Sequence, residues 1–122
     1  MRENAVNNEM INIGQSIGEN IGVHIDTWEV IIRKGDSIFV RELMEILWGR
    51  KSLKLKCLDE KRANKGKFRD RTALEPEKKA LIKDLLYEKI TQADVTGYAR
   101  KMRMSKLSRY MSLKLSDVLN KI

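Results

Sequence analysis

The clearest apolar pattern in the chain lies at residues 36–49, DSIFVRELMEILWG, where apolar residues recur every three or four positions. This spacing gathers them on one face of a helix. Asp36 or Ser37 fits the N-terminal cap, and Gly49 is a typical C-terminal stop. We therefore predict an amphipathic helix in this segment. Its buried face consists of Phe39, Val40, Leu43, Ile46 and Leu47.

A second helix is predicted in ALEPEKKALIKDLLYEKI, residues 73–90. Pro76 falls near the first turn, where its missing N–H costs nothing, and Glu75 and Glu77 suit the positive end of the helix dipole. The sequence TQAD that follows breaks the pattern. The predicted buried stripe consists of Leu81, Ile82, Leu85, Leu86 and Ile90.

A third apolar stripe follows Ser105 and predicts a C-terminal helix docked on the core by one face. The stripe consists of Leu107, Met111, Leu115, Val118 and Ile122. At about 100° per residue, the opposite side of this helix holds Ser105, Lys106, Arg109 and Ser112. Arg100, Lys101 and Arg103 come just before, in a turn or at the end of a short helix. We expect a cationic, serine-containing face that points outward.

The N-terminal part is less regular. In INIGQSIGENIGVHI, Gly14, Gly18 and Gly22 recur every four residues, which disfavours a helix and predicts turns and short extended pieces. The next segment, VHIDTWEVII, fits a strand or hairpin arm, or a helix that begins at Asp26. Periodicity does not separate these two interpretations.

Two further segments lie between the predicted helices. SLKLKCL, residues 52–58, fits a short strand or a short helix that buries Leu53 and Leu58, and we favour the helix. Residues 59–72 contain one large apolar residue, Phe68, so too little surface is available to offset the entropy of ordering. We predict a solvated, mobile loop there.

The predicted fold is mainly α, a compact bundle of about five helices, with a short N-terminal β-hairpin left open. The chain of 122 residues is about one domain in size. Its first ten residues are polar and rich in Asn, and we assign residues 1–18 to a flexible N-terminal arm and residues 19–122 to the folded domain.

The composition narrows the class of protein. The content of 42% apolar and 34% charged residues suits a globular fold, and a single cysteine, Cys57, rules out an internal disulfide framework. No apolar run approaches the roughly 20 residues of a membrane span, so no membrane partner is expected. The N-terminus lacks the apolar core of a secretory signal, which favours an intracellular location.

The net charge of +8 is divided unevenly along the chain: residues 1–48 carry four Lys/Arg and eight Asp/Glu, a net of −4. Residues 49–72 carry ten and three, a net of +7; residues 73–94 carry four and five, a net of −1; residues 95–122 carry seven and one, a net of +6. Such segregation is typical of proteins that bind polyanions.

The candidate binding residues lie in the two basic stretches. Lys106 and Arg109 are the first candidates for base or phosphate contact, and Arg100, Lys101 and Arg103 are candidates for phosphate contact. In the predicted loop of residues 59–72, which we call the basic loop, the candidates are Lys65, Lys67 and Arg69. The alternatives are a solvated helix face for the former set, and a plain solvated loop or a nuclear-localisation signal for the latter.

No catalytic or metal chemistry is indicated. His24 is the single histidine and has no Cys or His partners at ligand spacing, so no metal or other cofactor is expected. Cys57 has no plausible catalytic partner and is interpreted as a small buried residue. Trp28 and Trp48 are interpreted as core anchors. No two acidic residues occur in a pattern typical of a general acid and base, so we expect that the protein is not an enzyme.

The order of these segments resembles the BEN domain family. The resemblance rests on IGVHIDTWEV leading into SIFVRELMEILWGRKSLKLKCL, then the basic loop, ALEPEKKALIKDLL and ARKMRMSKLSRY. It covers residues 20 to about 115 and implies a mostly helical domain that binds double-stranded DNA in transcriptional control or chromatin, hence a nuclear protein. It also implies that the last helix enters the major groove.

By the same resemblance, the pair Ser105-Lys106 falls where family members place a hydroxyl residue followed by Lys, and Arg100 falls where they carry Arg. The family's short Ser-x-x-Gly-Lys turn is replaced here by CLDEKRANKGK. Family members bind palindromes as pairs, which makes a homodimer on DNA an expectation. Chromatin or corepressor proteins are further expected partners.

Two other functions remain open at this point. One is a protein-interaction module whose acidic and basic halves bind different partners, such as chromatin proteins. The other is RNA binding, which we consider a minor option because the basic segments were expected to lack exposed aromatic residues on which bases stack.

Overall fold

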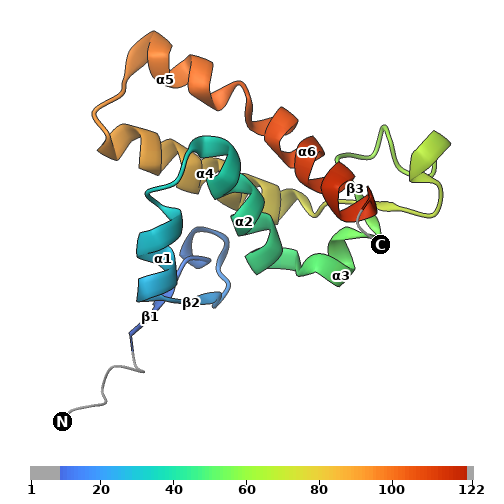
Figure 1. Cartoon of the computed structure of the whole chain (residues 1–122), viewed down its shortest axis with the longest axis horizontal. Helices are drawn as coiled ribbons and strands as arrows, with labels where there is room; N and C mark the ends of the chain where they lie inside the picture. Colours follow the sequence, from blue (N-terminus) through green and yellow to red (C-terminus); the bar gives the residue numbers. More distant parts are fainter. Residues whose placement is uncertain (1–8, 121–122) are drawn as a thin grey trace.

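The computed structural model describes residues 9–120 and shows a mainly helical fold with a short N-terminal hairpin, as predicted (Figure 1). The elements are β1 (Met10–Asn12), the 3-10 helix η2 (Gln15–Ile17), β2 (Gly22–His24), α1 (Ile25–Ile31), α2 (Asp36–Trp48), α3 (Arg50–Leu53), β3 (Lys56–Cys57), the 3-10 helix η3 (Gly66–Phe68), β4 (Thr72–Ala73), α4 (Pro76–Gln92), α5 (Gly97–Met104) and α6 (Leu107–Asn120).

The glycine-rich segment forms the expected turns and short strands. β1 pairs antiparallel with β2, with Ile11 opposite Val23. Between them the chain approaches itself so closely that a Cβ on Gly14 would lie 2.7 Å from the carbonyl oxygen of Glu19. Ile13 is buried in the core. Residues 10–18, which the composition placed in the N-terminal arm, are therefore part of the packed unit, whereas residues 1–8 of that arm lie outside the described residues.

The segment VHIDTWEVII contains both structures that its pattern left open. β2 ends at His24, and α1 begins at the next residue. The His24 side chain caps α1, because its Nδ1 accepts a hydrogen bond from the backbone N–H of Asp26 at 3.1 Å. Trp28 of α1 packs edge-to-face on Phe39, with ring centroids 5.8 Å apart. The single histidine thus has a local structural role.

α2 is the central helix and packs against both α4 and α6 (Figure 1). Phe39, Val40 and Leu43 are fully buried, as the apolar spacing predicts. Gly49 ends the helix with φ +81°, a value that side chains with a Cβ rarely adopt. Around α2 the core gathers residues from the hairpin, α4 and α6.

The segment SLKLKCL contains part of each of the two structures that its pattern left open, a short helix and a short strand. Its first residues belong to α3, a single turn that buries Leu53, and β3 then pairs in parallel with β4, joining Cys57 to Ala73. The favoured short helix is therefore correct only to Leu53. The basic loop between β3 and β4 is folded into turns, with the backbone N–H of Asn64 donating to the carbonyl of Phe68 at 3.1 Å.

The C-terminal stretch forms two helices. α5 lies along α4, and α6 begins at Leu107, two residues later than Ser105, and packs on α2 (Figure 1). Met111, Leu115 and Val118 are buried as predicted; Ile122 lies outside the described residues. No helix among residues 9–120 is long and apolar enough to cross a membrane.

Candidate nucleic-acid interface

Apart from Arg100, the cations of residues 97–114 fall into two sets, and the inward set consists of Arg103 and Lys114. Arg103 forms a two-pronged contact with Asp36 at the start of α2: its Nε donates at 2.8 Å and its Nη2 at 2.7 Å. The Asp36 side chain is only 9% exposed, and Lys89 of α4 joins it at 3.3 Å. The hydrogen bond from Arg103 is the main cause that lowers the pKa of Asp36, and it outweighs the opposing effect of burial.

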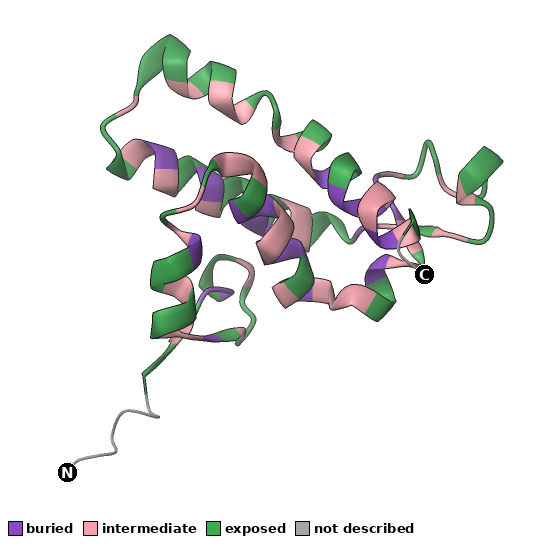
Figure 2. Ribbon diagram, in the orientation of Figure 1, coloured by how far each residue is buried: buried purple, intermediate pink, exposed green. Residues whose placement is uncertain are grey.

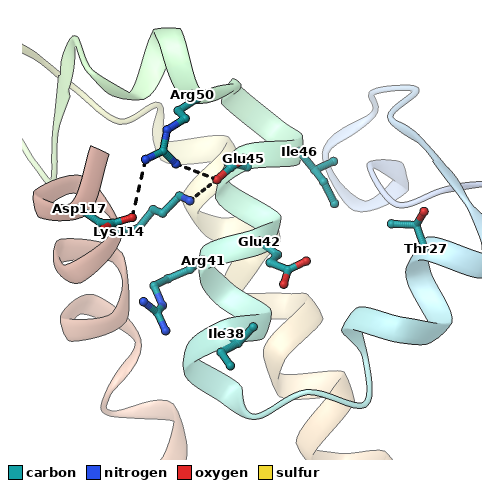
Figure 3. Close-up of a pocket in the computed structure, with 9 residues that line it drawn as sticks. All are labelled: Thr27, Ile38, Arg41, Glu42, Glu45, Ile46, Arg50, Lys114 and Asp117. Atoms are coloured by element: carbon teal, nitrogen blue, oxygen red, sulfur yellow. Dashed lines mark hydrogen bonds and ion pairs between the residues drawn. The ribbon is translucent and has the colours of Figure 1, made fainter. Parts of the chain in front are cut away.

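Lys114 lies on the apolar side of α6 and is 6% exposed. Its ammonium donates a hydrogen bond to Glu45 of α2, and Arg50 of α3 contacts the same carboxylate at 3.2 Å (Figure 3). Arg50 also lies 3.8 Å from Asp117. The hydrogen bond from Lys114 is the main cause that lowers the pKa of Glu45.

These groups line a pocket of about 430 Å³ that includes residues of α2 and α6 (Figure 3). Four of the charged residues drawn there, Glu45, Arg50, Lys114 and Asp117, are linked by ion pairs. The ion pairs join α6 and α3 to α2, and we interpret this pocket as a structural junction.

The outward set consists of Lys101, Lys106 and Arg109, which are all exposed. None of the three has an ion pair with another residue in the described part of the chain. Figure 2 shows exposed stretches along α5 and α6. Arg109 and Ser112 of α6 are both exposed, and these two positions lie about 60° apart around the helix, so they share one strip of its surface. The positive charges of Lys101, Lys106 and Arg109 are therefore available to a ligand.

The turn between α5 and α6 holds the predicted pair Ser105 and Lys106. The Ser105 hydroxyl donates to the carbonyl of Met102 at 2.6 Å, and the carbonyl of Lys106 accepts the backbone N–H of Tyr110 at 3.1 Å, in the first turn of α6. Both side chains are exposed. The turn thus presents a hydroxyl and an ammonium next to each other on the surface.

Arg100 has a mixed role. Its guanidinium carbon lies 4.3 Å from the ring centroid of Tyr87, and its Nη1 donates to the Thr91 hydroxyl at 2.9 Å. These contacts hold α5 on α4 and fix the orientation of the guanidinium. Its remaining N–H groups are not used by a described residue.

A cation that the sequence reasoning missed, Lys83 of α4, lies beside this site. Lys83 lines a shallow pocket of about 320 Å³ between α4 and α5 together with Arg100 and Lys101, and a second one of about 220 Å³ beside Ser108 of α6. A helical projection of α4 contained the signal, because Lys79, Lys83 and Tyr87 recur every four residues.

The basic loop reaches α6 through one of its three predicted residues. Lys67 lines a pocket of about 180 Å³ with Ser112 and Ser116 of α6, whereas Lys65 and Arg69 are exposed but do not line it. We define the basic face as Lys67, Lys83, Lys101, Lys106 and Arg109, with α6 at its centre.

The expected lack of exposed aromatic residues in the basic segments is wrong for residues 97–114, because Tyr98 of α5 is 76% exposed. Met102, on the same outward side of α5, is also exposed. An exposed aromatic ring next to cations is a feature on which single-stranded bases stack, so single-stranded ligands belong among the ligands to be tested.

The residues considered for chemistry lie elsewhere. Cys57 is buried, and burial is the main cause that raises the pKa of its thiol, which disfavours the nucleophilic thiolate. Among residues 9–120 no three His, Cys, Asp or Glu side chains gather in a way that could hold a metal ion.

The fold and the basic face define a small helical domain with a cationic outer surface, and comparison with known proteins finds two similar sequences. BEN domain-containing protein 5 of Homo sapiens and that of Mus musculus are each 27% identical to the chain over 104 residues, 84% of this chain and 25% of the relative. These matches agree with the resemblance to the BEN domain family that the sequence predicts.

The chain spans about a quarter of the length of the curated relatives it matches. No family model matches the chain, and no solved structure matches it.

Proposed function

We propose that the chain binds double-stranded DNA through the basic face. The observation that carries this proposal is the outward set: three exposed cations, without acidic partners in the described chain, on a stretch that contains no acid from residue 97 to residue 114. Lys83 and Lys67 extend the positive surface on either side of α6. The BEN domain resemblance supports a role associated with chromatin or transcription in general terms.

In this proposal α6 enters the major groove with its exposed strip, which carries Arg109 and Ser112. An α-helix fits the width of that groove, and Arg and Ser side chains contact both base edges and phosphates. Lys101, Lys106, Lys83 and Lys67 contact the phosphates beside it. Selectivity for a sequence would come from Arg109 and its neighbours, because phosphate contacts alone carry no sequence information.

The inward set acts indirectly in this proposal. Arg103 was a candidate for phosphate contact, but two of its donor groups already bind Asp36. We assign it a positioning role: it fixes the end of α5 against α2, and thereby the direction in which Lys101 and Lys106 point. Arg100 combines its contact with Tyr87 and a phosphate contact through its remaining N–H groups.

A salt titration of binding to a pool of random 20-base-pair duplexes, followed by sequencing of the retained fraction, tests the proposal. If about six phosphates are neutralised, the logarithm of the association constant falls with a slope of about −5 against the logarithm of salt. We expect that slope and an enriched sequence motif, which reads as a palindrome if two copies bind together. Single-stranded DNA and RNA of the same length serve as competitors.

Two results would contradict the proposal. Affinity that does not depend on salt would exclude phosphate contact as the basis of binding. Stronger competition by single strands than by duplex would instead identify Tyr98 and the basic face as a single-strand platform. A steep slope without an enriched motif would remove sequence selectivity and leave non-specific coating of DNA.

A further inference from the structure

A second hollow lies on a different part of the molecule, beside the N-terminal hairpin. It has a volume of about 620 Å³ and is walled by β1, η2, α1 and α4. Its apolar lining includes Ile11, Trp28 and Leu85, all half-buried and packed against the core. Its polar lining includes Gln15, Asp84 and Glu88. We call this hollow the acidic groove.

Asp84 and Glu88 are exposed and lie one turn apart on the same edge of α4. Like charges at this spacing disfavour a helix by about 0.2–0.5 kcal/mol. Neither carboxylate has an ion pair with another residue of the described chain. This differs from Asp36 and Glu45, which are both neutralised by the inward set. The groove thus keeps an unfavourable, uncompensated negative charge next to apolar surface.

α4 separates this groove from the basic face. Asp84 and Glu88 lie on one edge of the helix, and Lys83 and Tyr87 line the pocket on the other edge. The phosphates of a nucleic acid would be repelled by the acidic edge. A ligand of the groove therefore has to be positively charged and to offer apolar surface as well.

We propose that the acidic groove binds a short basic peptide segment of a partner protein, one that carries Lys or Arg next to an apolar anchor. Such side chains lay their apolar stems on apolar surface while the charged head stays at the rim. Here the stem would cover Leu85 and the Trp28 ring, and the head would meet the carboxylates of Asp84 and Glu88. The apolar anchor would fill the space beside Ile11.

The inference does not rest on the proposed DNA binding, because none of the groove residues belongs to the basic face. It gives the alternative of a protein-interaction module a defined surface and a defined class of partner. Because Lys83 and Tyr87 lie about 100° around α4 from Asp84 and Glu88, the two surfaces are separate, and one copy could hold DNA and a basic peptide at the same time.

The test is selection of a displayed library of random 12-residue peptides on the folded protein, with excess random duplex DNA present to cover the basic face. We expect enriched peptides with at least two Lys or Arg and an apolar residue. Binding of the synthetic peptides should fall at least tenfold in Asp84→Lys/Glu88→Lys, and several-fold in Asp84→Asn/Glu88→Gln, which keeps the shape of the groove. Affinity should not change in the matched control, Lys101→Ala/Lys106→Ala/Arg109→Ala.

Three results would overturn the proposal. The first is no enrichment, or enrichment of peptides without positive charge. The second is equal binding to wild type and to both charge variants, provided that circular dichroism shows all of them folded. The third is self-association in sedimentation experiments that Asp84→Lys/Glu88→Lys abolishes, since this would identify the occupant as the basic loop of a second copy.

Discussion

The inward and outward sets of cations come from one short stretch of sequence, and they meet opposite environments. Arg103 and Lys114 each reach a carboxylate of α2, and both carboxylates respond with a lowered pKa. Lys101, Lys106 and Arg109 have no such partner in the described chain and stand in solvent. The difference shows that a run of like charges in a sequence can serve two purposes, one within the fold and one outside it.

The ion pairs of the inward set account for part of the uneven distribution of charge along the chain. The net of −4 over residues 1–48 and of +6 over residues 95–122 suggested a polyanion binder. Part of the segregation is instead complementarity within the molecule, since Asp36 and Glu45 of the acidic part bind Arg103 and Lys114 of the basic part. Within residues 95–120, the cations that remain, the outward set and Arg100, are available to a ligand.

The largest expected effect comes from removing Asp36, the carboxylate that Arg103 of the inward set neutralises. Asp36→Ala leaves Arg103 and Lys89 without their common partner in a poorly solvated place, and we expect the free energy of unfolding to fall by about 3 kcal/mol. Urea denaturation measures it. Asp26→Ala, at an exposed carboxylate of α1 whose side chain is 82% exposed, is the control and should change stability by no more than about 0.5 kcal/mol. Equal effects of the two substitutions on stability would contradict the distinction between the buried carboxylate of Asp36 and the exposed carboxylate of Asp26.

The next effect concerns DNA affinity. In Lys101→Ala/Lys106→Ala/Arg109→Ala, three phosphate or base contacts are lost, and we expect the affinity for duplex DNA to fall about 30-fold, or about 2 kcal/mol. Stability should change little, because these side chains are exposed. Fluorescence anisotropy with a labelled duplex measures the affinity. Retention of full affinity would show that the outward set does not contact DNA.

A smaller effect is expected from the basic loop. Lys65→Ala/Lys67→Ala/Arg69→Ala removes the same number of charges, but only Lys67 borders α6. We expect affinity for the duplex to fall about fivefold, or about 1 kcal/mol. A loss greater than that of the outward set, in the same anisotropy experiment, would move the centre of the interface from α6 to the loop.

The smallest effect concerns pH. Burial raises the pKa of Glu75, but hydrogen bonds from Trp48 and Lys56 outweigh it and lower the pKa to about 2. A carboxyl with a lowered folded pKa stabilises the fold above its unfolded pKa of 4.5, and this stability is lost as pH falls toward 2. Glu75→Gln should therefore flatten the decline in stability below pH 4.5, while at pH 7 the loss stays under about 1 kcal/mol.

Urea midpoints at pH 7, 4 and 2.5 measure this pH dependence. The wild type should lose stability over the range, because Asp36 and Glu45 also have lowered pKa values. If Glu75→Gln and the wild type decline in parallel, the Trp48 and Lys56 hydrogen bonds do not stabilise the charged form of Glu75.

The sequence predicts the long helices well and the pairing of distant segments poorly. α2 and α4 follow from apolar spacing, because one face of each is buried. The parallel pairing of β3 with β4 joins residues that no local pattern connects. The acidic groove also requires the hairpin to be placed beside α4, which spacing along the chain does not specify.

For the candidate site residues, the sequence predicts which side chains are exposed better than it predicts which residues they contact. Arg109 lies outward because the apolar stripe of α6 fixes its direction, whereas Lys106 is exposed in the turn before α6. The partner of Arg103 lies 67 residues away, and that of Lys114 lies 69 residues away, so neither pair is visible in a local pattern. Lys114 itself carried a signal: it falls within the apolar stripe, between Met111 and Leu115, where a cation needs a buried partner.

The most direct test is the salt dependence of duplex binding for three proteins: wild type, Lys101→Ala/Lys106→Ala/Arg109→Ala, and Lys114→Met. Loss of the phosphate contacts of Lys101 and Lys106, and of a third where Arg109 also meets a phosphate, should make the slope of log affinity against log salt less steep by about 1.8 to 2.7 in the triple variant. Lys114→Met, measured where it is folded, should keep the wild-type slope because its charge faces Glu45. The same slope in the triple variant as in the wild type, or an equal decrease in Lys114→Met, would contradict the division of the basic stretch into inward and outward sets.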